Sequence, residues 1–112
     1  MANVYKNIQA TISSAGSNVD MYTGPDETTS LIKSIKLYNT HSANLVVDIT
    51  VYDFSSTTDF EYDTVTVNTA ASVSLLTFNN VLILEAGDIL KMKTPTTNVV
   101  KMTAAVLQTS RN

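Results

Sequence analysis

The sequence contains no cysteine and no tryptophan, and only 15% of its residues are charged, against the usual quarter. Without cysteine, the chain has no disulfide, no thiolate zinc site and no thiol nucleophile. Its absence also fits a protein made and assembled in a reducing cytoplasm. Residues typical of exposed helices are scarce or scattered. The longest apolar run, residues 81–84, is far too short to span a bilayer, so we expect no membrane association.

The charge balance also limits the classes of partner. The formal net charge is −3, and the six lysines are dispersed along the chain, with the single arginine at position 111. A protein that binds the nucleic-acid backbone needs a clustered basic face to displace counterions from phosphates. The sequence therefore argues against direct nucleic-acid binding. The N-terminus lacks the apolar core of a signal peptide, so we expect a soluble protein made in the cytosol.

Threonine, serine and valine are abundant, with 17, 11 and 12 copies. Threonine and valine are branched at Cβ and pack well on a pleated surface, so this composition favours strands. Several segments alternate apolar and polar residues with the two-residue period of a strand that buries one face. In the last of these segments, Lys101, Thr103 and Gln108 are expected to face outward. The expected inward positions are Val4, Ile8, Ala10, Ile12, Ile35, Leu37, Leu45, Val47, Ile49, Val51, Val73, Leu75, Val100, Met102, Ala104 and Val106.

Turn signals separate these segments about every ten residues. Gly24 and Pro25 strongly favour a turn, Asn79 and Asn80 form either a turn or a bulge, and Pro95 ends a strand because it cannot donate to a ladder. Seven or eight short strands spaced in this way are typical of a β-sandwich or a small barrel. We expect an all-β fold: one domain over residues 1–112, an antiparallel β-sandwich of jelly-roll or immunoglobulin-like type.

One segment carries both an irregularity and a row of acids. Phe60 and Tyr62 share one parity and the following valines share the other, which predicts a bulge or break near Asp63 and Thr64. Asp59, Glu61 and Asp63 alternate, so they would project from one strand face. Such a row could chelate a cation or supply paired carboxylates for acid–base chemistry. No basic residue lies near them in sequence to tune a pKa, so a solvated face is the simpler interpretation.

Two further candidate sites have a structural explanation. Residues 85–88, EAGD, place two carboxylates around one glycine, which is fewer ligands than a calcium loop needs. A tight turn, with Gly87 at positive φ and Asp88 bonded to a local amide, explains them. His41 is the only histidine, and without cysteine it cannot build a conventional zinc site. We therefore expect an exposed loop residue at His41, no catalytic residue, no metal site and no cofactor.

The aromatic residues allow a second function. Five tyrosines with asparagine and threonine could form a sugar-binding platform, although tryptophan, which usually supplies much of that contact, is absent. Tyr22, Tyr38 and Tyr52 are more simply amphipathic rings at sandwich edges or at an interface. Low charge with many hydroxyl groups also suits a surface packed against other subunits.

Three short motifs occur in a distinctive order: YTGP at residues 22–25, KSI at 33–35 and LEAGD at 84–88. In place and order they resemble a recurrent small protein of tailed bacteriophages, especially marine ones. The resemblance covers nearly the whole chain. NTAAS, at residues 68–72, stands where that group often has a proline-alanine-glycine turn.

The resemblance implies a non-enzymatic virion structural protein with a β-sandwich fold, made and assembled in the host cytoplasm. It would be a capsid decoration (cement) protein that binds the major capsid protein, or a component of the neck, tail or fibre that binds other virion proteins. Either role implies a homo-oligomer or a lattice assembly. A carbohydrate-binding module is the alternative from another class, and an enzyme using Asp59, Glu61 or Asp63 comes third.

Exposed edge strands and an N-terminal arm are natural adhesive elements, because unpaired ladder groups invite strand addition. The expected contact segments are residues 2–12 and the loop at Gly24 and Pro25. The individual candidates are Asn3, Val4, Tyr5, Tyr22, Gly24 and Pro25.

Overall fold

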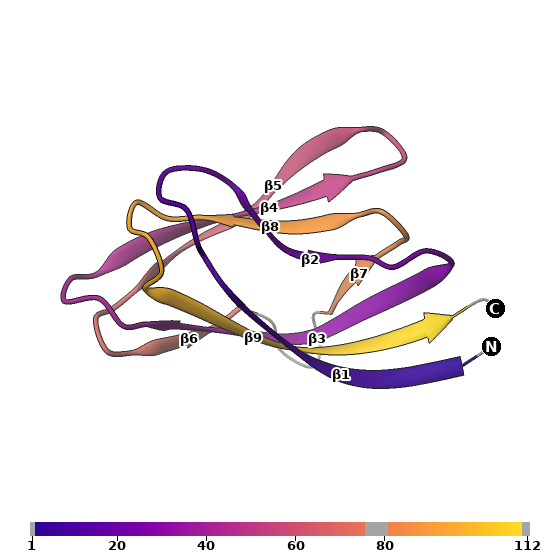
Figure 1. Cartoon of the computed structure of the whole chain (residues 1–112), viewed down its shortest axis with the longest axis horizontal. Helices are drawn as coiled ribbons and strands as arrows, with labels where there is room; N and C mark the ends of the chain where they lie inside the picture. Colours follow the sequence, from indigo (N-terminus) through magenta and orange to yellow (C-terminus); the bar gives the residue numbers. More distant parts are fainter. Residues whose placement is uncertain (1, 76–80, 111–112) are drawn as a thin grey trace.

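The computed structural model of the chain describes residues 2–75 and 81–110, which form strands joined by turns (Figure 1). No helix among these residues is long and apolar enough to cross a membrane. Asn79 and Asn80, expected as a turn or bulge, lie outside the described residues. The described strands are β1 (Ala2–Thr11), β2 (Val19–Thr23), β3 (Thr28–Asn39), β4 (Leu45–Asp53), β5 (Thr58–Val67), β6 (Ser72–Ser74), β7 (Leu82–Leu84), β8 (Ile89–Lys93) and β9 (Val100–Ser110).

The strands form two antiparallel sheets that face each other (Figure 1). Sheet A has the order β1-β9-β3-β6, and β7 also pairs with β3, whereas sheet B has the order β2-β8-β4-β5. Because β6 and β7 pair with successive parts of β3, they act as two pieces of one interrupted edge strand. If β6 and β7 are counted as one strand, the strand order in the two sheets is that of the eight-strand jelly roll, one of the two expected sandwich types.

The core lies between the sheets and consists of the alternating apolar side chains. Fifteen of the sixteen expected inward positions belong to the buried cluster or pack against it, so the two-residue alternation is confirmed. The exception is Val4, which is 45% exposed. Gln108 was expected to face outward, and this expectation is wrong: it has the parity of Val106 and its Nε2 donates to the Tyr22 hydroxyl at 2.7 Å. A terminal amide can lie inward there because the hydroxyl satisfies it.

Register shifts interrupt three strand pairs. Between β4 and β5, Tyr62 is the extra residue, which confirms the predicted bulge close to Asp63. Between β3 and β9, the extra residue is Lys33. That second bulge lets Ile32 and Ile35, three positions apart, both face the core, where each is 0% exposed. Bulges change which face a side chain takes, and they decide here which polar residues reach the surface.

Candidate interaction surfaces

The corner between β7 and β8, residues 85–88, is a tight turn, as its sequence predicts. The amide of Asp88 donates to the carbonyl of Glu85 at 3.1 Å, and Gly87 has a φ of 87°. A positive φ at the third residue of such a turn is the type II form, which favours glycine. The Asp88 carboxylate accepts from the amides of Glu85 at 2.9 Å and of Phe54 at 3.0 Å. Asp88 therefore holds the turn and ties it to the β4–β5 connection.

The same corner packs against the loop that follows β2. The amide of Gly24 donates to the Asp88 carbonyl at 2.8 Å, and the amide of Gly87 donates to the Gly24 carbonyl at 3.0 Å. A Cβ at position 24 would overlap the carbonyl oxygen of Glu85, so only glycine allows this approach. Two of the three motifs behind the phage resemblance, YTGP and LEAGD, thus form one structural unit.

Of the expected contact residues in this loop, Pro25 is exposed, Gly24 is buried and Tyr22 is half-buried. The Tyr22 hydroxyl lies 2.7 Å from the hydroxyl of Ser30 and accepts from Gln108 at 2.7 Å. Tyr22 is in sheet B and its two partners are in sheet A, so these bonds join the sheets. Tyr22 and Gly24 therefore have structural roles, and Pro25 offers the surface.

The other three expected contact residues, Asn3, Val4 and Tyr5, lie at the free end of β1. Among the described strands, β1 is at the edge of sheet A and pairs only with β9. Every side chain from Asn3 to Asn7 is exposed, on both faces of the strand, and Tyr5 is 73% exposed. The opposite sheet therefore does not cover this half of β1. The ring of Tyr5 lies 5.6 Å from Lys33 Nζ, its cation–π neighbour across the sheet.

A groove of about 590 Å³ lies on sheet B, over β4, β5 and β8. Its charged lining consists of Asp48, Asp59, Glu61, Asp63 and Lys93. Lys93 Nζ lies 3.9 Å from Asp48, and Lys91 Nζ lies 3.3 Å from Asp59. Two of the carboxylates are therefore paired with lysines of β8. Among the described residues, no three His, Cys, Asp or Glu side chains are grouped so that they could hold a metal ion.

The bulge at Tyr62 interrupts the regular row expected of the three carboxylates on β5. Asp59 and Glu61 lie opposite Tyr52 and Thr50, whereas Asp63 lies opposite the core residue Ile49. The Asp63 carboxylate accepts from the amide of Thr64 at 2.8 Å and stays at the rim of the groove. Partial burial raises the pKa of the Tyr62 phenol, and the adjacent negative charge of Asp63 raises it further.

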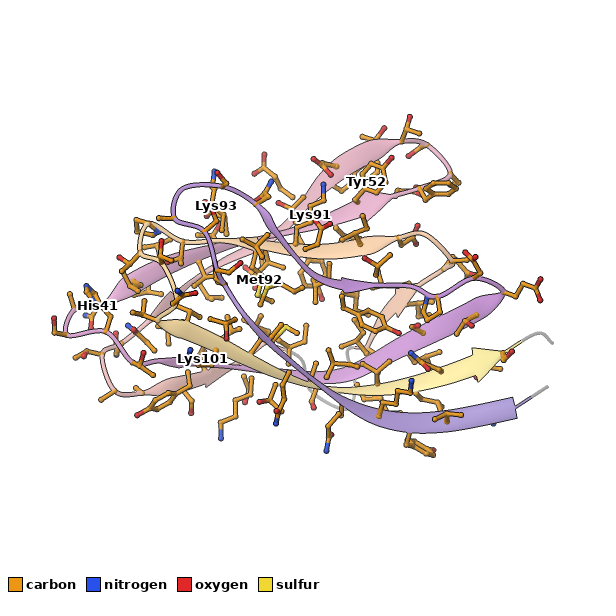
Figure 2. All side chains as sticks on the ribbon, in the orientation of Figure 1. His41, Tyr52, Lys91, Met92, Lys93 and Lys101 are labelled. Atoms are coloured by element: carbon orange, nitrogen blue, oxygen red, sulfur yellow. The ribbon has the colours of Figure 1, made fainter. Side chains whose placement is uncertain are left out.

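The remaining residues singled out in the sequence are spread over the molecule. His41 lies in the β3–β4 connection, as expected, but it is half-buried, and its amide donates to the side chain of Asn39 at 2.8 Å. Tyr38 is exposed on sheet A, and the ring of Tyr52 lies 4.9 Å from Lys91 Nζ on sheet B (Figure 2). The groove includes one tyrosine, Tyr62. The tyrosines therefore do not gather into one platform.

Sequence reasoning missed Asn39, which organises the end of the sandwich near His41. Its side chain is 0% exposed, and its Nδ2 donates to the carbonyls of Ala43 and Val67, each at 2.9 Å. In the sequence, asparagine followed by threonine and histidine indicates an ordinary turn. Only its buried position in the structure shows that the Asn39 side chain holds the backbone together.

Comparison with known proteins finds solved structures with a similar fold. The chain matches no protein-family model and no curated protein. One similar structure is from Bacillus endospore appendages, which are disulfide-linked pili. The TM-score is 0.61 and the identity 14%, and the match covers 98% of this chain and 89% of that chain. A second similar structure is a chain of the virus-like particle of extra small virus, from the giant freshwater prawn Macrobrachium rosenbergii. The TM-score is 0.52 and the identity 16%, and the match covers 96% of this chain and 79% of that chain. At these identities the likeness shows a shared fold.

Proposed function

We propose that this chain is a non-enzymatic structural protein of a tailed-bacteriophage virion, and specifically a capsid decoration protein that binds the major capsid protein. The order of the YTGP, KSI and LEAGD motifs supports the phage origin. The jelly-roll fold supports a role in assembly, because the two similar structures come from a pilus and a virus-like particle. A location in the neck, tail or fibre is an alternative form of this proposal. The copy number in the particle distinguishes it from capsid decoration.

The observation that carries the proposal is the free half of β1. Within residues 2–75 and 81–110, its backbone is paired on one side only, with β9, and the side chains from Asn3 to Asn7 are exposed on both faces. An extended partner segment can add to such an edge by main-chain hydrogen bonds, and side chains such as Tyr5 then give specificity. The 112 residues contain no cysteine, so they form no disulfide with a partner.

The first experiment is quantitative mass spectrometry of purified virions, which compares the copy number of this chain with that of the major capsid protein. A ratio near one, or a simple fraction of it, supports a decoration protein repeated over the shell. A handful of copies assigns the chain to the neck, tail or fibre. Absence from the particle contradicts the proposal and makes a glycan-binding screen the next measurement.

The second experiment tests the contact surface on β1. Removal of residues 2–7 should abolish binding to particles that lack the protein, while Ile8, Ala10 and Ile12 keep their places against the core. The double variant Val4→Lys, Tyr5→Lys should weaken binding similarly, because charges on an edge strand oppose strand addition.

The matched control is Ser14→Lys, Ser17→Lys, which adds the same charge in the exposed β1–β2 loop. Circular dichroism checks that all three variants keep the sandwich. If the deletion and the β1 variant bind like the control, β1 is not the contact.

A further inference from the structure

The two sheets carry opposite charges. The strands of sheet A contain four lysines, and none of their described residues is acidic. The strands of sheet B contain six carboxylates and two lysines. The sheet A lysines are Lys6, Lys33, Lys36 and Lys101. The sheet B carboxylates are Asp20, Asp48, Asp53, Asp59, Glu61 and Asp63.

Many of these charges point away from the core, to the outer faces. Lys36 and Lys101 each stand between two buried neighbours on their strands, so their side chains leave the outer side of sheet A. On sheet B, Asp48 stands between buried Val47 and Ile49 and faces outward in the same way. Figure 2 shows Met92 between the sheets, Lys91 and Lys93 on the outer side of sheet B, and Lys101 at sheet A. The molecule thus has a basic outer face and an acidic one.

Among the described residues, salt bridges do not cancel the charge difference between the sheets. The two salt bridges found there, Lys91 with Asp59 and Lys93 with Asp48, lie on sheet B. They neutralise part of the acidic face, but Asp20 and Glu61 remain exposed on it. In the same described part of the chain, no lysine of sheet A takes part in a salt bridge. Within these residues, the lysines of the basic face are therefore not neutralised by carboxylates.

We infer that the partner is a second copy of this chain, with the basic face of one copy stacked on the acidic face of the next. Contacts between like faces would bring lysines against lysines or carboxylates against carboxylates, which is unfavourable. The pairing of unlike faces is heterologous, so each added copy presents a new free face, and the contact propagates into a ring or a filament. This inference rests on the proposed assembly role and specifies the surfaces by which copies associate.

The faces are large enough for a stable contact. The strands run along the longest dimension of the molecule (Figure 1), and the Cα extents are 45 × 27 × 22 Å. Each sheet face therefore lies within a Cα outline of 45 × 22 Å, which is comparable with the roughly 800 Å² per partner buried in standard interfaces. The threonine and serine hydroxyls on these faces can supply further hydrogen bonds once the charges have set the orientation.

The test removes the net charge of one face at a time. The variant of the basic face is Lys36→Glu, Lys101→Glu, and the variant of the acidic face is Asp20→Lys, Glu61→Lys. All four residues are exposed, and none has a salt bridge among the described residues. The control matched to the acidic-face variant is Asp26→Lys, Glu27→Lys, which makes the same charge change in the exposed β2–β3 turn. Sedimentation velocity, as a function of protein concentration, reads the association at about 20 mM and about 500 mM NaCl.

The unmodified chain should associate with increasing concentration, more strongly at low salt, because exposed charges are screened at high salt. Each face variant alone should associate at least about tenfold more weakly, since its altered sheet then carries equal numbers of positive and negative charges and no longer attracts the other face. An equimolar mixture of the two face variants should recover association, because each now offers the face that the other needs. The control variant should associate like the unmodified chain.

Three results would overturn the inference. These are an unmodified chain that stays monomeric at low salt, face variants that associate normally, or a mixture that fails to recover. Binding of the basic face to a polyanion such as heparin, lost in Lys36→Glu, Lys101→Glu while self-association is unaffected, would also overturn it. If only the stacking inference fails, the chain is still found in purified virions by mass spectrometry. If the proposed function fails, the chain is absent from the particle. The two failures are therefore distinguished.

Discussion

At Gly24 two backbone segments approach too closely for any side chain. The residue lies in the YTGP motif, and the carbonyl of Glu85, in the LEAGD motif, occupies the place of its Cβ. Main-chain hydrogen bonds from both segments, at 2.8 and 3.0 Å, hold the approach. Two of the three motifs behind the phage resemblance are therefore packing requirements of the fold, and they say little about which surface is used.

Replacement Gly24→Ala should destabilise the fold by about 1–3 kcal/mol, because the Glu85 backbone must shift to admit the methyl group. Gly16→Ala is the control: its Cβ meets nothing within 4 Å, but its φ is 72°, so it should cost about 1 kcal/mol from conformation alone. Urea unfolding of both variants measures the difference. An equal or smaller loss in Gly24→Ala contradicts the close approach.

Asp53, at the end of β4, gives a prediction about pH. A hydrogen bond from the Ser55 hydroxyl at 2.8 Å is the main cause that holds the pKa of Asp53 below its ordinary value of 3.8. The folded state therefore favours the carboxylate. The resulting stabilisation is present above pH 3.8 and is lost as the pH falls through the lower folded-state pKa.

Replacement Ser55→Ala should raise the pKa of Asp53 toward 3.8, since the hydroxyl donor is removed and the amide of Ser55 remains. An NMR titration of the Asp53 carboxyl carbon measures this shift. Ser14→Ala, in an exposed loop, is the control and should leave the titration unchanged. The same titration curve in both variants would show that Ser55 does not hold this carboxylate.

Among the elements, β1 is divided between an exposed half and a half that packs on the core. Its apolar positions keep one parity from Val4 to Ile12, but Val4 is 45% exposed and Ile12, just beyond the strand, is 0% exposed. The second half packs against the core and the first half extends past it. The division explains how one strand can be both part of the fold and a surface for a partner.

This division predicts unequal costs of truncation along the segment. Ile12→Ala should lower the free energy of unfolding by about 2–5 kcal/mol, as for other fully buried isoleucines. Val4→Ala should change it by no more than about 0.5 kcal/mol, because an exposed valine loses little on truncation. Urea unfolding of the two variants tests this. A large cost at Val4 would mean that the free half of β1 is covered.

In the whole molecule, the two ends of the described chain pair with each other. Ala2 lies opposite Ser110 in the ladder between β1 and β9, and Figure 1 shows the start of β1 beside the end of β9. Strands so distant in sequence pair only after most of the chain has been ordered, which makes folding of such topologies slow. The ends of the described chain are also close enough to be joined.

Joining the termini with a short flexible linker should stabilise the fold by about 2–4 kcal/mol and speed folding, because the unfolded chain loses entropy. The control is the same linked sequence opened between Ser55 and Ser56, in the exposed β4–β5 turn. It has the linker but no closed ring, so it should lose most of the gain. Equal stability of the ring and the opened chain would contradict the entropic explanation.

Local features of this fold could be predicted because each depends on neighbours in the chain. Alternation placed Ile35 and Leu37 in the core, and the parity switch after Tyr62 located a bulge. The bulge at Lys33 had no such signal, because its cause is the packing of Ile32 against a distant sheet. Asn39 was missed for the same reason: its partners, such as Val67, are far along the chain.

The candidate surfaces divide in the same way. Exposure of Asn3, Val4, Tyr5 and Pro25 agrees with their expected role as contact residues, a role that remains a prediction. Tyr22 is joined to Ser30 and Gln108 inside the sandwich, which only the packing of the two sheets could show.

The sequence by itself determined the all-β class, the inward face of most strands and the turn at residues 85–88, since these follow from a two-residue period and from glycine chemistry. Only the tertiary structure decided which strands are neighbours. The lysines are dispersed along the sequence, yet Lys33, Lys36 and Lys101 share one sheet. The jelly-roll order interleaves strands from both ends of the chain, so charges far apart in sequence gather on one face and their opposites on the other.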